Sequence, residues 1–314
     1  MKQKFSLYAL FAIGLTGIIL VFPKQCLSLS FNGLNLWFTK MIPALFPFMV
    51  LSGIIIRMNL ISPCVNILKP ILGKLFRVDA PCIYGMVLGF LCGFPMGAHT
   101  AAELYENKII SKREASFLLA FCNNIGPVYF LSFVVPSLEL SSVGINLFGM
   151  YGLPFLYGLL LRYTVYSGNL SCETKENGSQ TNSCSLAAAL DQSIGSALLN
   201  ITRLGGYMII FNLLFILPML FTRLLTLPGP LKTALIGGAG CLLEITGGIS
   251  LIGDSSPLFV LCVLPFGGLS CIAQTGSMIR NTDLSLTEYV MHKMILTAIT
   301  VLFYLLAANQ FFLP

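Results

Sequence analysis

The chain has 314 residues, of which 56% are hydrophobic and 10% are charged, and its mean hydropathy is +0.86. A soluble domain carries about 25% charged residues, so the composition excludes a soluble globular protein. It predicts an all-α polytopic membrane protein embedded in the lipid bilayer. The net charge of +6 comes without a basic tract or interleaved aromatic and basic residues, which argues against a nucleic-acid partner.

Apolar runs long enough to cross a bilayer recur along the chain. We predict an N-terminal transmembrane helix within residues 1–26, because Lys2 and Lys4 precede an apolar run at 5–23 and no small-residue cleavage pattern follows it. Residues 166–185 are polar and without periodicity, so they are predicted to be a flexible cytoplasmic linker. Further spans are predicted at 42–58, 115–135, 142–163, 205–222, 257–278 and 288–308.

Two shorter, glycine-rich apolar segments, 81–99 and 232–252, are predicted to be re-entrant hairpins. Two of the spans are also predicted to be broken transmembrane helices, at Asn-Asn-Ile-Gly-Pro (123–127) and at Phe-Gly-Gly (266–268). In lipid an unpaired backbone group costs several kcal/mol, so irregular backbone survives there only inside protein or beside a wet cavity. Such interruptions at corresponding places in two halves indicate a transporter-like binding site.

The two halves follow one order of elements. Each begins with an amphipathic helix, at 27–41 and 187–204, which we expect to lie in the membrane interface. A span, a hairpin, a broken span and a final span follow in both halves, so we predict structural repeats at 27–165 and 186–314.

Charge predicts the orientation in the cell membrane. With the N-terminus in the cytoplasm and the C-terminus outside, fourteen Lys and Arg residues fall on the cytoplasmic side, including Lys293, and four fall outside, including Lys40. This distribution obeys the positive-inside rule. In this topology the hairpins enter from opposite sides, so the repeats are inverted.

Glu244 is the most unusual residue of the second hairpin, where it stands between Gly-Gly-Ala-Gly-Cys-Leu-Leu and Ile-Thr-Gly-Gly. A carboxylate near the membrane centre costs about 2.5–3.5 kcal/mol on insertion scales, and intramembrane charges usually mark function. Glu244 either binds a polar solute or a coupling ion, or it caps the free N–H groups at the start of a half-helix. The second alternative is purely structural.

The other polar residues at the interruptions also leave two interpretations open. Asn123 and Asn124 either pair with carbonyls freed by the break or present donors and acceptors to a ligand. Gln274 and Ser277 follow the second break and either contact a ligand or join helices by hydrogen bonds. His99 closes the first hairpin as a cap, an interface residue or a proton relay.

No catalytic or metal motif stands out. The ten cysteines are scattered without a C-x-x-C pair, and no P-loop, G-x-S-x-G or H-E-x-x-H occurs. We therefore predict neither an enzyme nor a cofactor, and no catalytic or metal-binding residues. The outer helix surfaces suit a homo-oligomer.

Several strings are similar to YlbJ-type sporulation integral membrane proteins, which carry a nucleoside-recognition or Gate domain. They are GFLCGFPMGAH (89–99), FLLAFCNNIGP (117–127), LLEITGG (242–248) and FGGLSCIAQTGSMI (266–279). The resemblance implies a role in sporulation, such as cortex formation, and a fold shared with spore-maturation proteins and ferrous-iron and nucleoside transporters. Its matching positions add Gly93, Pro95 and Thr246 to the candidate substrate-binding residues.

Three functions remain open. The first is a permease-like protein that binds a small polar solute, nucleoside-like or other, at the repeat interface. The second is a non-transporting scaffold or assembly factor in sporulation. The third is a metal-ion gate with Cys122, Cys241 or Cys271 as soft ligands.

Overall fold

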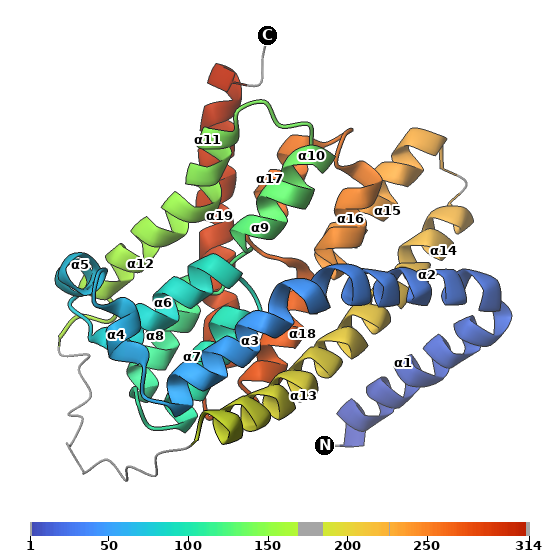
Figure 1. The fold of residues 1–314 in the computed structure, drawn as a ribbon. Coiled ribbons are helices and arrows are strands. Elements are labelled where there is room, and N and C mark those ends of the chain that lie inside the picture. The colour runs from blue at the N-terminus through green and yellow to red at the C-terminus, as the bar shows by residue number, and fades with distance from the viewer. Residues whose placement is uncertain (1, 169–184, 226, 312–314) are drawn as a thin grey trace.

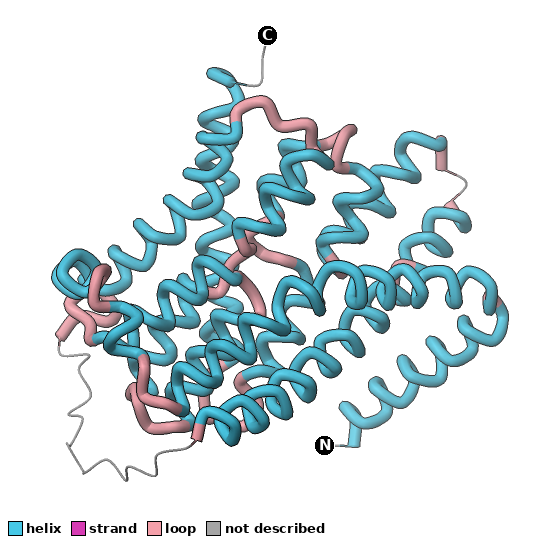
Figure 2. The backbone as a smooth tube through the Cα atoms, viewed as in Figure 1, coloured by secondary structure: helices cyan, strands magenta, loops and turns pink. Residues whose placement is uncertain are grey.

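The computed structural model describes residues 2–168, 185–225 and 227–311, which form helices joined by loops and contain no strand (Figures 1 and 2). By length and composition, six of the described helices can cross a membrane, which confirms an α-helical protein with several spans. The predicted first span, residues 5–23, lies in the 20-residue helix α1 (Lys2–Val21) and is not among these six. The six are Pro23–Arg57, Lys112–Ser137, Val143–Tyr163, Leu186–Leu224, Pro257–Met278 and Leu286–Ala307.

The first half is a run of mostly short helices. It contains α1 (Lys2–Val21), α2 (Pro23–Leu36), α3 (Ile42–Arg57), α4 (Ile61–Val65), α5 (Lys74–Phe76), α6 (Ala80–Cys92), α7 (Met96–Glu106), α8 (Lys112–Cys122), α9 (Pro127–Tyr129), α10 (Val135–Ser137), α11 (Val143–Leu147) and α12 (Leu153–Tyr163). The second half contains α13 (Leu186–Leu213), α14 (Ile216–Leu224), α15 (Gly229–Leu243), α16 (Ile245–Ile252), α17 (Pro257–Val263), α18 (Gly268–Met278) and α19 (Leu286–Phe311).

Four π-helical turns interrupt the first half, and proline accounts for three of them. Pro43, Pro136 and Pro154 each follow such a turn by two residues. Because proline has no N–H, the carbonyl group four residues before it loses its α-helical donor. The residue before the proline then donates its N–H to the carbonyl five residues back, as Ile42 does to Trp37. The turns are η1 (Trp37–Met41), η2 (Lys69–Gly73), η3 (Phe130–Val134) and η4 (Phe148–Gly152).

The predicted amphipathic helices 27–41 and 187–204 are not separate elements. Each runs on into the following span, giving helical segments of 35 and 39 residues. An indole and two glycines hold the two continuous helices against each other. Trp37 Nε1–H donates to the Ile201 carbonyl at 2.8 Å, and Gly33 and Gly53 lie against Met208 and Ser193. The two segments therefore pack antiparallel.

Two helical hairpins stand on opposite sides of the centre (Figure 1). The chain reverses between α6 and α7 at Gly93–Pro95, and between α15 and α16 at Glu244. Small residues let α15 and α16 touch, since a Cβ on Gly248 would collide with the Cys241 backbone nitrogen. The first hairpin continues to Glu106, beyond the predicted end at 99. Entry of either hairpin into the membrane stays a prediction.

Each hairpin tip rests on the break in the broken span of its own half. At the first tip, Gly93 lies against the backbone of Gly126. At the second, Gly268 lies beneath the carbonyls of Cys241 and Leu243. The same packing in both halves agrees with the predicted repeats, although their inversion across a membrane is a prediction.

One lysine does not occupy the position that the charge count assumed. Lys293 is 2% exposed inside the protein on α19, so its assignment to the cytoplasmic surface is wrong. Lys40 is exposed and lies in η1, at the middle of the continuous segment Pro23–Arg57, and its assignment to the outside stays a prediction. Most of the predicted linker, residues 169–184, lies outside the described residues.

Asp283 holds the loop between α18 and α19 against the first half of the chain. The stability of the fold therefore depends on the protonation of this carboxylate. Lys112 Nζ and Tyr105 OH donate to its carboxylate at 2.9 and 2.8 Å, and these bonds hold the pKa of Asp283 below its usual 3.8. A lowered acid pKa stabilises the fold above the usual pKa, and this contribution is lost as the pH falls.

We expect Asp283→Asn to lower the melting temperature at pH 7 by about 1 °C or less, because the pair is exposed. The difference from the wild type should shrink as the pH falls below 4, as followed by differential scanning fluorimetry. A difference that grows toward low pH would contradict this account.

Candidate functional site

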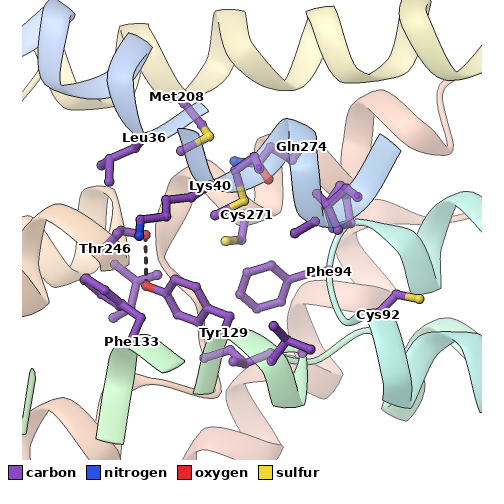
Figure 3. A pocket seen from close by; sticks show the side chains of 18 of the residues that line it. Leu36, Lys40, Cys92, Phe94, Tyr129, Phe133, Met208, Thr246, Cys271 and Gln274 are labelled. Carbon is purple, nitrogen blue, oxygen red and sulfur yellow. Dashed lines mark hydrogen bonds between the residues drawn. The ribbon is translucent and has the colours of Figure 1, made fainter. Parts of the chain in front are cut away.

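A cavity of about 460 Å³ lies where the two hairpin tips and the first helix break meet. Its walls come from η1 and α3, from the α6–α7 tip, from α9 and η3, from the α15–α16 tip, and from α18. Figure 3 shows the Tyr129, Phe94 and Gln274 side chains facing one another across it. The polar or charged lining residues include Thr39, Lys40, Tyr129, Ser132, Glu244, Thr246 and Gln274.

Glu244 lines this cavity and also caps α16. Its two carboxylate oxygens accept the backbone N–H groups of Thr246 and Gly247 at 3.2 and 2.8 Å. The side chain is buried at 4% exposure, and the positive end of the α16 dipole stabilises its negative charge. The sequence left a structural and a ligand-binding role as alternatives, and this geometry provides the structural one without excluding the other.

Thr246 and Gln274 complete the polar part of the cavity. Tyr129 OH donates to Thr246 Oγ1 at 3.0 Å, which joins the second hairpin tip to the first broken span (Figure 3). Gln274 Nε2 donates to Ser270 Oγ at 2.9 Å, one turn earlier on α18. The carbonyl oxygen of Gln274 accepts no hydrogen bond from the described residues, so it is available to a ligand donor.

Asn123 does not line the cavity and instead fastens three helices together. Its Nδ2 donates to Thr275 Oγ1 at 2.9 Å and to Tyr289 OH at 3.1 Å. Its Oδ1 accepts the Ala98 N–H at 3.2 Å. The residue is fully buried, so in this structure its amide serves packing of α7, α18 and α19.

Asn124 likewise points away from the cavity, toward a residue that the sequence reasoning missed. Lys293 Nζ donates to Asn124 Oδ1 at 2.9 Å and lies 5.7 Å from the centre of the Tyr289 ring. A lysine inside the predicted span 288–308 was the available signal, because an ionisable side chain within a span is rarely left facing lipid.

The remaining candidates fall on both sides of the first tip. Pro95 lines the cavity, whereas Gly93 is buried behind it against Gly126. Ser277 is buried farther along α18 and is not part of the lining. His99 Nε2 lies 3.8 Å from Glu103 Oε2.

Glu103 connects the first hairpin to the two long helices. Its Oε1 pairs with Arg57 Nη1 at 3.1 Å, and the same guanidinium donates to Ser193 and Ser196 of α13 at 3.2 Å each. Glu103 is therefore buried, at 8% exposure, although other charged residues follow it in the sequence.

Lys40 is the second residue that the sequence reasoning missed. Figure 3 shows its side chain extending into the cavity toward the side formed by Tyr129 and Thr246. The signal was its place beside Pro43, which makes the helix continue through a π turn rather than end there. A helix that continues leaves Lys40 in the interior of a span.

The described residues contain no group of three or more His, Cys, Asp or Glu side chains placed to hold a metal ion. Cys271 faces the cavity, whereas Cys122 and Cys241 do not line it. The geometry of the described chain therefore gives the metal-gate alternative no ligand set.

Two comparisons with known proteins bear on this arrangement. Residues 38–153 match the model of the Gate family, described as nucleoside recognition. The chain is 24% identical over 328 aligned positions to the sporulation integral membrane protein YlbJ of Bacillus subtilis (strain 168), covering 92% of this chain and 79% of that protein. No solved structure matches. Residues 38–153 are therefore similar to the Gate family, and the resemblance of the chain to YlbJ-type sporulation integral membrane proteins is confirmed.

Proposed function

We propose that this protein is a membrane transporter that binds a small polar solute in the cavity between its two hairpin tips. The observation that carries the proposal is the cavity's composition. Pro95 comes from the first tip, Gly126 from the first break, Glu244 and Thr246 from the second tip, and Gln274 from the helix after the second break. A site shared between two halves is the arrangement that alternating access requires.

The solute would be held by polar groups that face one another across the cavity. Gln274 offers a carbonyl oxygen, and the hydroxyl groups of Thr246 and Tyr129, which are hydrogen-bonded to each other, also line the cavity. Movement of one half against the other would open the cavity to alternate sides of the membrane. Because the relative with 92% coverage is a sporulation protein, we place this transport in sporulation.

A scaffold or assembly role is the second candidate, and one observation favours it. Asn123, Asn124 and Glu244 all satisfy hydrogen-bonding groups of the protein itself. A fold can keep such residues for stability without binding any solute. The two functions differ in whether the cavity takes a ligand.

The test is the thermal stability of the purified protein against nucleosides, amino acids, peptidoglycan precursors and divalent metals. A ligand at 100 times its dissociation constant stabilises the folded state by about 2.7 kcal/mol. We expect a solute to raise the melting temperature of the wild type but not of Gln274→Leu, which removes a cavity amide. Gln192→Leu, the same change at an exposed position of α13, is the matched control and should respond like the wild type.

Two results would contradict a site in this cavity. The first is a solute that stabilises Gln274→Leu and the wild type equally. The second is a panel in which no solute shifts the wild type, with Gln274→Leu as stable as Gln192→Leu, which would favour the scaffold role.

A further inference from the structure

Lys40 lies too far from either helix end to behave as an interfacial lysine. It is the central residue of the continuous segment Pro23–Arg57, with about 25 Å of helix on each side at 1.5 Å per residue. Lysines near helix ends extend their ammonium groups to the interface, whereas one in the middle of a span faces protein or a wet cavity. Lys40 lines the cavity and belongs to a π-helical turn, a feature common at functional sites.

The cavity lining contains one acidic and one basic side chain, which do not form an ion pair with each other. Glu244 and Lys40 are the acidic and basic residues of its lining, and the Glu244 carboxylate already accepts two backbone N–H groups of α16. Lys40 is exposed and forms no ion pair among the described residues, so its ammonium group attracts an anion to the open side of this largely apolar cavity.

The rest of the lining is apolar, and part of it is open to the outside of the molecule. Phe94, Tyr129 and Phe133 line the interior. Phe48 and Val128 line the same cavity while 42% and 66% exposed. An apolar rim of this kind suits entry of a ligand with an apolar body, and a polar solute without one would leave these side chains unfilled.

We propose that the cavity takes an amphipathic organic anion, with its charged group on Lys40 and its apolar body against Phe94, Tyr129 and Phe133. The inference rests on the proposed function and names the solute class for the same site. The anionic group belongs either to a free solute or to a lipid headgroup at the apolar rim. Both would pair with Lys40 in the same way.

The experiment compares indole-3-butyrate with its neutral amide as probes, using protein in phosphatidylcholine nanodiscs and thermal stability as the readout. We expect the carboxylate to stabilise the wild type and Lys40→Arg with an affinity at least tenfold above that of the amide. Lys40→Met should lose this preference. Lys24→Met, at an exposed position of the preceding helix α2, is the matched control and should keep it.

Other outcomes separate this inference from the proposed function. Equal affinities for carboxylate and amide in the wild type, or an unchanged preference in Lys40→Met, would overturn the anion assignment while leaving a solute cavity in place. If neither probe binds and a neutral solute of the wider panel does, the anion assignment falls alone. If no compound binds, both the anion assignment and the proposed transport function are contradicted.

The two sources of the anion are distinguished without added solute. Replacing phosphatidylcholine by phosphatidylglycerol should raise the melting temperature of the wild type above that of Lys40→Met only if a lipid headgroup occupies the site. No difference between the two lipids, together with binding of the carboxylate probe, assigns the site to a free solute.

Discussion

Gly93→Ala is expected to lower the free energy of unfolding by about 3–5 kcal/mol, the largest effect of any single methyl group at the hairpin tips. Gly93 adopts φ +75° and ψ −164°, a region that is essentially restricted to glycine and costs other residues about 1–3 kcal/mol. The new Cβ would also collide with the backbone nitrogen of Gly126. Backbone at a fixed helix break cannot move aside as a flexible side chain can, so overpacking adds about 1–3 kcal/mol.

The measurement is sodium dodecyl sulfate titration of the protein in mild detergent, followed by circular dichroism. Gly206→Ala is the matched control, because Gly206 is helical and a Cβ there would meet nothing within 4 Å. Alanine is favoured in helices, so this control should be as stable as the wild type or slightly more. Equal stabilities for the two variants would show that the first tip does not rest on Gly126.

The second large effect is expected for the buried pair Asn124 and Lys293. Asn124→Leu removes the carbonyl that accepts the bond from Lys293 Nζ and should cost about 2–4 kcal/mol, because a buried ammonium is left without that partner. Lys293→Met keeps most of the side-chain volume and should cost about 1–3 kcal/mol. The double variant should be more stable than the sum predicts, by about 2 kcal/mol, since both partners are then apolar.

The four proteins of this double-mutant cycle are compared by the same detergent titration. The exposed residues Asn35 and Lys24 provide a control cycle with the same substitutions, Asn35→Leu and Lys24→Met. That cycle should be additive within about 0.5 kcal/mol. Additivity at Asn124 and Lys293 as well would mean that the amide does not hold the ammonium, and that Lys293 has another partner.

Local sequence signals were enough to locate the elements that form the site. The interruptions at 93–95, 123–127, 244 and 266–268 all appear as reversals or breaks, because glycine, proline and asparagine act on the backbone within a few residues. The composition also established an α-helical membrane protein. Glu244 and Gln274 were named from these signals, Pro95 and Thr246 were named from the family resemblance, and all four line one cavity.

The local sequence could not predict which polar side chains at a helix break face the cavity and which face the protein interior. Asn123 and Asn124 occupy the same interruption as the cavity residues, yet their amides bind Tyr289 and Lys293 of the last helix. A side chain's partner depends on helices far away in the sequence, and a polar residue in a span has the same pattern whether it meets ligand or protein. The repeat pattern paired the two halves without giving the orientation of any side chain.

The sequence by itself determined the membrane class, the helix breaks and the hairpin turns, because these follow from hydropathy and from backbone chemistry. The tertiary structure decided the helix continuity that carries Lys40 into the cavity, the burial of Lys293, and the capping of α16 by Glu244. Each of these depends on long-range packing, which fixes where a charge is solvated. The fold buries Lys293 inside the protein and leaves Lys40 exposed in the lining of the cavity.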